Sequence, residues 1–350
     1  MRMTNSMLVS NYMNNLQRNL GNMGTLQNQL ATGKTIQRAS ENPYTAVRTM
    51  QLNNEISANK QYNTNITDTS NWLDTTDTAL GQANSIMARI KELTVKAGNG
   101  AYSGDEIGAI KDEVVEKIKE LGQVLNTSFD GNFIFGGTKS TSKPVYVDDN
   151  GNISLIAKDG SNIFSAGTFN VDRPKNEKIY NQLDSKLNSE IAQGVVVEYN
   201  KTAIDVLNYS YDKDTGKTDA GTIGILSDLV KCLNVASGTK QSETLSDGTT
   251  TIDNPKSALE KICGKMTEDI TAAASHISQI RSNVGAMENR MKSAKDTNED
   301  QNYNMTSILS ETDDIDFAQK TMEYAVLQTV YTATLQTSAK ILNNTLLDYV

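Results

Sequence analysis

The sequence predicts a mainly α-helical protein whose N- and C-terminal helices pair as a coiled coil. Between them we expect an elongated helical bundle domain with a β-hairpin, and an inserted central domain that is mixed or β-rich. Three observations support this prediction: seven-residue apolar repeats near both ends, an aromatic, glycine-framed stretch at 128–144, and a polar composition over 138–253. Such repeats are typical of helices that pack along narrow apolar seams.

The first helix is predicted by an apolar residue at every seventh position. The repeat consists of Val9, Leu16, Met23 and Leu30. Asn19 interrupts the adjoining seam, and Gly21 and Gly24 lower the helix propensity, so this helix is marginal alone and needs a partner. We expect it to end near TGKT at 32–35.

A second helix is expected from Thr45 to about Ala97, and a third after the turn-like segment GNGAYSG at 98–104. The second carries a further heptad repeat through Ile66, Leu73, Leu80 and Met87. Ser103 followed by Glu106 is the capping-box arrangement at the start of the third helix.

The aromatic stretch follows the third helix and holds half of the six phenylalanines of the chain, Phe129, Phe133 and Phe135. Asp130-Gly131 between apolar residues predicts a tight hairpin. Our hypothesis is that Phe133 and Phe135 project and fix axial contacts between subunits. The alternative is that they cap the end of the helical bundle.

Residues 138–253 are rich in Thr, Ser, Asn, Asp and Gly and contain short apolar runs. The sequence DDNGN at 148–152, between two such runs, predicts a second hairpin. This segment is expected to be a separate domain with more strand than the rest of the chain.

Helix is expected to return at Pro255, directly after Asn254, and a polar stretch at 295–304 is expected to interrupt it before the last helix. The last helix repeats apolar residues at Leu335 and Leu342 on one seam, and at Leu346 on another. Because both terminal helices need a partner, we expect them to pair with each other. The predicted domains are then 1–43 with 303–350, 44–140 with 254–302, and the insert 141–253.

The composition excludes some classes of protein. A net charge of −9 argues against a general nucleic-acid binder, although residues 1–60 carry six basic side chains and only two acidic ones. No membrane-spanning run and no signal peptide are visible, so we expect either a cytoplasmic protein or export without a cleaved signal. Whether Cys232 and Cys263 pair is left open.

No catalytic, cofactor-binding or metal-binding residue is predicted. His276 is the only histidine, and nothing at metal-ligand spacing accompanies it. An enzymatic function therefore has no positive support in the sequence, and a binding role of the insert 141–253 remains a further alternative.

Five stretches in order resemble the bacterial flagellin family. They are MRMTNSML at 1–8, LATGKTIQRASENP at 30–43, FDGNFIFGGTKS at 129–140, IRSNVGAMENRM at 280–291 and TLLDYV at 345–350. In the fourth, Val284 stands where the family has Leu. The start MRMT and the FGGTK hairpin favour the hook–filament junction members of the family over flagellin itself, which is the alternative.

This resemblance implies a structural, non-enzymatic subunit of the bacterial flagellum, without cofactor or membrane insertion. It implies assembly at the hook–filament junction, where the subunit is the platform for flagellin polymerisation. The partners implied are other copies of the chain in a ring or short helical layer, hook-associated protein 1, flagellin and an export chaperone. It also implies an extracellular location, reached through the flagellar secretion channel.

Overall fold

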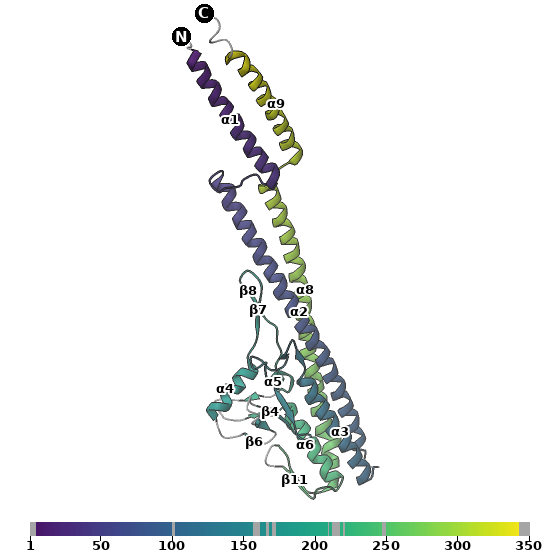
Figure 1. Cartoon of the computed structure of the whole chain (residues 1–350). Helices are drawn as coiled ribbons and strands as arrows, with labels where there is room; N and C mark the ends of the chain where they lie inside the picture. The colour runs from purple at the N-terminus through teal and green to yellow at the C-terminus, as the bar shows by residue number, and fades with distance from the viewer. Residues whose placement is uncertain are drawn as a thin grey trace, which may run out of the picture. The chain divides into compact units, whose positions relative to one another are not determined.

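The computed structural model describes residues 5–99, 102–156, 162–165, 168–169, 173–208, 210–211, 218–219, 221–246 and 250–342. The predicted fold class, mainly α with long terminal helices and small β-hairpins, is confirmed (Figure 1). The helices are α1 (Asn5–Thr32), α2 (Pro43–Ala97), α3 (Gly104–Leu125), α4 (Arg173–Asp184), α5 (Ala203–Val206), α6 (Gly221–Ala236), α7 (Pro255–Lys261), η1 (Ile262–Met266, a π-helix), α8 (Thr267–Asp313) and α9 (Phe317–Leu342).

The chain divides into two compact units. Unit 1 comprises Met1–Gln61 and Asn298–Val350, and unit 2 comprises Tyr62–Thr297. Helices α1 and α9 therefore belong to unit 1, together with the first part of α2 and the last part of α8. The predicted break within 295–304 is wrong, because α8 runs on to Asp313. That stretch is polar but contains neither Gly nor Pro, and polarity alone does not end a helix.

Helix starts follow the local signals in the sequence. At α3, the Ser103 side chain accepts from the Glu106 backbone N–H, and the Glu106 side chain accepts from the Ser103 backbone N–H, which completes the predicted capping box. At α7, the Asn254 side chain caps the helix and Pro255 occupies its first turn, as expected. Each cap satisfies backbone N–H groups that have no partner within the helix.

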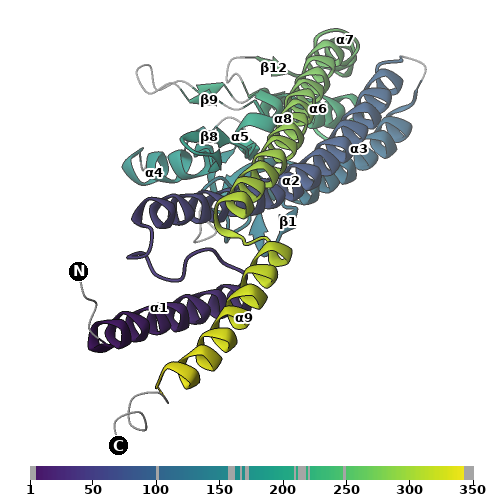
Figure 2. The same ribbon diagram turned by 90° about the horizontal axis from the view of Figure 1, so that it is seen from above.

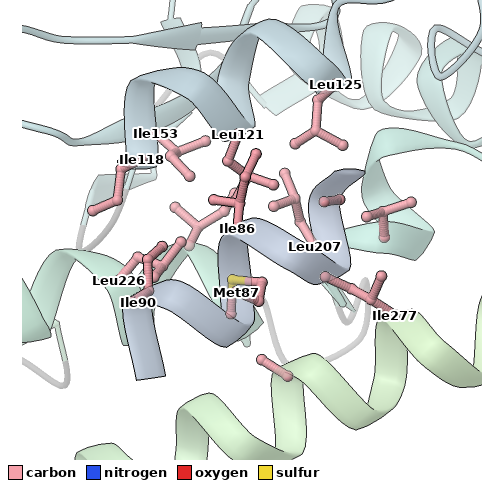
Figure 3. Close-up of a cluster of buried hydrophobic side chains, with 14 of the residues drawn as sticks. Ile86, Met87, Ile90, Ile118, Leu121, Leu125, Ile153, Leu207, Leu226 and Ile277 are labelled. Carbon is pink, nitrogen blue, oxygen red and sulfur yellow. The ribbon is translucent and has the colours of Figure 1, made fainter. Parts of the chain in front are cut away.

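In unit 2, α2, α3 and α8 lie beside one another (Figure 2). Figure 3 shows their meeting point, where Ile86, Met87 and Ile90 of α2 face side chains from the other elements. Ion pairs join the same helices at the surface, from Arg89 on α2 to Glu113 on α3 and from Arg281 on α8 to Asp77 on α2.

The inserted segment carries most of the strands, and its largest sheet is an antiparallel meander in the order β3-β4-β5-β6. The DDNGN turn joins its first two strands as predicted, with Val147 paired to Ile153 and Gly151 at a φ of +79°. The strands are β1 (Ser128–Phe129), β2 (Asn132–Phe133), β3 (Val145–Val147), β4 (Ile153–Ile156), β5 (Asn162–Ser165), β6 (Thr168–Phe169), β7 (Asn188–Ala192), β8 (Val195–Glu198), β9 (Ser210–Tyr211), β10 (Thr218–Asp219), β11 (Glu243–Thr244) and β12 (Thr251–Ile252).

The insert packs against the helical bundle through the apolar helix α6, which contacts both α3 and α7. Buried side chains of the insert, such as Ile153, Leu155 and Leu226, belong to the same hydrophobic cluster as those of α2 and α3 (Figure 3). Unit 2 is thus held together by one continuous core that includes both the bundle and the insert.

Candidate functional site

Helices α1 and α9 pack against each other along one face of each helix (Figure 1). The predicted α1 seam lies on this face, because Val9, Leu16, Met23 and Leu30 are all partly buried. The Tyr12 hydroxyl donates a 2.6 Å hydrogen bond to the Thr334 carbonyl across the pair. The pairing of the two terminal helices therefore agrees with the expectation from the sequence.

The packed face of α9 is not the one expected. Leu335 is 42% exposed, whereas Tyr324, Leu327, Tyr331 and Thr334 are partly buried and share one face at helical spacing. The side chain of Leu342 and the whole of Leu346 lie outside the described residues, and the role of the seams in assembly stays a prediction.

Another face of α9 carries an exposed apolar stripe, made of Met322, Val326 and Val330. Their exposed fractions are 64%, 62% and 42%. A spacing of four residues places them next to one another along the helix, about a third of a turn around from the packed face. Within the described part of the chain, nothing covers this stripe.

A short backbone clasp joins the two chain segments that leave α1 and enter α9. The Thr35 backbone N–H donates to the Asp313 carbonyl at 2.6 Å, and the Ile315 N–H donates to the Gly33 carbonyl at 3.1 Å. Gly33 has a φ of +71°, a conformation that glycine adopts without strain as it ends α1. The TGKT segment thus ends the helix and also ties the two segments together.

Lys34 adds charge to the clasp by pairing with Asp314 at 2.7 Å and with Asp313 at 3.1 Å. The hydrogen bond from Lys34 lowers the pKa of Asp314, and the same bond raises the pKa of Lys34. Both ends of the Lys34–Asp314 pair are more than 40% exposed, so the pair contributes at most about 1 kcal/mol.

The predicted aromatic hairpin is formed by β1 and β2. Asp130 and Gly131 have φ angles of +50° and +76°, the left-handed pair of a two-residue type I′ turn. Phe129 and Phe133 are partly exposed, but Phe135 has no exposed surface. The expectation that Phe135 projects must therefore be corrected, since the chain turns inward after Phe133 and places this ring in the core. Axial contact through Phe133 stays a prediction.

Beside the hairpin lies a pocket of about 320 Å³ that the sequence did not predict. Trp72 of α2 forms its centre, with Phe129 and Tyr199 set edge-on to it at ring-centroid distances of 6.1 and 5.9 Å. Asp68 and Asp130 also line the pocket. These side chains come from three segments far apart in the sequence, so no spacing of residues indicates the pocket.

The single histidine and the two cysteines lie apart from the pocket lining. His276 contacts the Asp205 carbonyl at 2.9 Å through Nε2. Cys232 and Cys263 are both free, which settles the open question of their pairing. Burial raises the pKa of Cys232 to about 12, so this thiol stays protonated. The described residues contain no group of three or more potential metal ligands and no helix long and apolar enough to cross a membrane.

Both helical ends of the chain match family models. Residues 3–140 match the bacterial flagellin N-terminal helical region, and residues 267–350 match the bacterial flagellin C-terminal helical region. The two matches together cover more than half of the chain.

Curated relatives include flagellins. Flagellin 1 of Proteus mirabilis is 26% identical over 167 residues, which are 47% of this chain and 42% of the relative. A flagellin of Salmonella berta is 25% identical over 204 residues, 58% of this chain and 40% of the relative. The chain therefore spans less than half the length of these relatives.

Solved structures show the same fold over most of their length. FlgL from Xanthomonas campestris superposes with a TM-score of 0.52 at 17% identity, covering 74% of this chain and 99% of that protein. Flagellar hook associated protein-3 from Legionella pneumophila gives 0.54 at 14% identity, covering 75% and 98%. With both terminal family regions present and this shared fold, the chain belongs to the bacterial flagellin family.

Proposed function

We propose that this chain is a structural subunit of the bacterial flagellum that assembles at the hook–filament junction and provides the platform for flagellin polymerisation. Its likeness to the two solved hook-associated proteins extends over nearly all of their chains. The match to the flagellin relatives covers less than half of theirs. The proposed role is structural and involves no catalysis.

The observation that carries the proposal is the apolar stripe of Met322, Val326 and Val330 on a terminal helix whose other face is already packed. Full burial of one such side chain is worth about 1.5–3 kcal/mol. Since each is roughly half exposed, covering all three against a neighbouring copy would yield about 3 kcal/mol per contact. A subunit built this way gains stability when it is stacked.

The partners that go with this role are other copies of the chain in a ring or short helical layer, hook-associated protein 1, flagellin and an export chaperone. The corresponding location is extracellular, at the junction, after export without a cleaved signal peptide. We retain the α1 and α9 seams and the three-part domain division as parts of the same proposal.

Flagellin itself is the second candidate, because the matched family models and the curated relatives are those of flagellins. The two candidates differ in what is lost when the protein is absent. A junction subunit is needed before any filament grows, whereas a filament subunit is the bulk of the filament.

Gene deletion in the source bacterium separates the candidates. For a junction subunit we expect hooks without filaments and flagellin released into the medium. Intact filaments would contradict the junction role, and loss of filaments without released flagellin would favour the filament subunit.

A matched pair of variants tests the stripe directly. Val326→Ser removes an apolar side chain from the stripe, while Val95→Ser makes the same change at a position that is 54% exposed on α2, outside the stripe. We expect Val326→Ser to reduce filament number with an unchanged melting temperature, and Val95→Ser to leave filaments intact. Equal filament numbers in the two variants would argue against the stripe as an assembly surface.

A further inference from the structure

The proposed junction role does not depend on the pocket beside the β1–β2 hairpin, whose lining combines aromatic and acidic side chains. Three aromatic side chains, Trp72, Phe129 and Tyr199, line it together. The interplanar angle to Trp72 is 84° for Phe129 and 90° for Tyr199. Trp72 thus packs edge-to-face with each of the other two rings. The electron-rich faces of aromatic rings attract a cation, so a pocket lined by three rings can hold one where a face borders the space.

The charges that line the pocket have one sign. Among the described residues that line it, only Asp68 and Asp130 are charged, and both are exposed. Neither carboxylate makes an ion pair within the described part of the chain. An anionic ligand would meet two like charges here, whereas a cation would neutralise them.

The hairpin turn brings the backbone of Asp130 to the pocket. Asp130 holds a φ of +50°, which costs free energy in any residue other than glycine, although Asp and Asn tolerate it best. Asp130 and its neighbour Phe129 both line the pocket.

We propose that this pocket binds an organic cation, an alkylammonium or guanidinium group, against its aromatic wall and beside the carboxylates of Asp68 and Asp130. A bare metal ion fits less well, because the described residues offer no group of three potential ligands. The volume of about 320 Å³ is at the small end of ligand pockets and suits a single ammonium-bearing group.

The test uses the full chain and its own reporter, because Trp72 is the only tryptophan. Choline is titrated at constant ionic strength while the tryptophan emission is recorded, and its uncharged isostere dimethylbutanol is titrated in parallel. We expect a saturable change with choline and none with the alcohol. A linear response to choline, or an equal response to the alcohol, would overturn the proposal.

Two variants locate the binding. Asp68→Asn and Asp130→Asn together remove both charges, and Asn keeps the left-handed turn, so the fold is retained. The control Asp296→Asn makes the same change at an exposed position of α8 that does not line the pocket. We expect the double variant to bind choline at least about tenfold more weakly, equivalent to about 1.4 kcal/mol. An equal affinity in the double variant and the control would overturn the proposal, and unchanged melting temperatures verify the fold.

The cation has two possible sources, a soluble molecule or a Lys or Arg side chain of a second copy. Sedimentation of the full chain with and without saturating choline distinguishes them once binding is established. If choline dissociates self-associated chains, the natural occupant is a basic side chain of a neighbouring copy. If association is unaffected, the occupant is a soluble ammonium compound.

Discussion

Phe135 provides the sharpest test of how the aromatic hairpin is built. Its side chain has no exposed surface, whereas Phe133, two residues earlier, is partly exposed. Truncating a fully buried Phe to Ala typically costs about 3–5 kcal/mol through lost apolar contact and the cavity that remains. Because Phe133 buries only part of its ring, we expect Phe133→Ala to cost roughly half as much or less.

Urea denaturation followed by the emission of Trp72 measures this difference, because Trp72 belongs to the same hydrophobic cluster as Phe135. With a slope of about 3 kcal/mol per M, Phe135→Ala should lower the unfolding midpoint by roughly 1–1.7 M. Tyr146→Ala is the matched control, since this aromatic side chain is 52% exposed on β3 and its loss should leave the midpoint nearly unchanged.

The refuting result is a midpoint for Phe135→Ala equal to that of Tyr146→Ala. It would mean that the ring is not part of the core and that the original hypothesis of a projecting Phe135 deserves to be restored. A large loss of stability with Phe135→Ala, beside a small loss with Phe133→Ala, would leave only Phe133 as a candidate for axial contact.

Three further predictions follow from local contacts. Gly122→Ala should destabilise the protein despite a gain of about 1 kcal/mol in helix propensity, because the new methyl overlaps Cγ2 of Val147. In urea denaturation, the double variant with Val147→Ala should lose less free energy of unfolding than the sum of the two single variants. The capping hydrogen bond from the Ser103 backbone lowers the pKa of Glu106. The stabilisation from this bond is therefore present above about pH 4.3 and is lost as pH falls through the folded-state pKa. Hydrogen exchange in the first turn of α3 should show this pH dependence, and Glu106→Gln should abolish it. In the folded protein iodoacetamide should modify the exposed Cys263 and spare Cys232, and mass spectrometry showing equal modification would contradict the burial.

Local signals predicted the helix and turn positions well, because each of them acts over a few residues. The cap at Ser103, the Asp130-Gly131 turn and the start at Pro255 all depend on backbone groups nearby in the sequence. The heptad repeat likewise identified the packed face of α1. These elements could be predicted because their stabilising contacts are local or strictly periodic.

Choices between competing faces could not be predicted in the same way. Helix α9 offers more than one apolar stripe, and periodicity does not report which of them packs against α1. The pocket depends on Trp72, Phe129 and Tyr199 meeting from three segments far apart in the chain. Such contacts follow from tertiary packing, so no spacing in the sequence indicates them.

The two units differ in how much core they possess, and this difference bears on assembly. Among the described residues, the buried apolar side chains of unit 1 are only Leu26, Ala46, Leu52 and Ile56, and none of them lies on α9. Unit 2 holds the large continuous cluster. A region with so small a core has little to offset the conformational entropy of ordering its helices, so its opening should require less free energy than unfolding of unit 2. A neighbouring subunit that binds only the ordered helix pair would then stabilise the pair by mass action. The exposed stripe on α9 is the surface to which such a subunit would bind. On this argument, the stability of the terminal helix pair should depend on subunit concentration, while that of unit 2 should not.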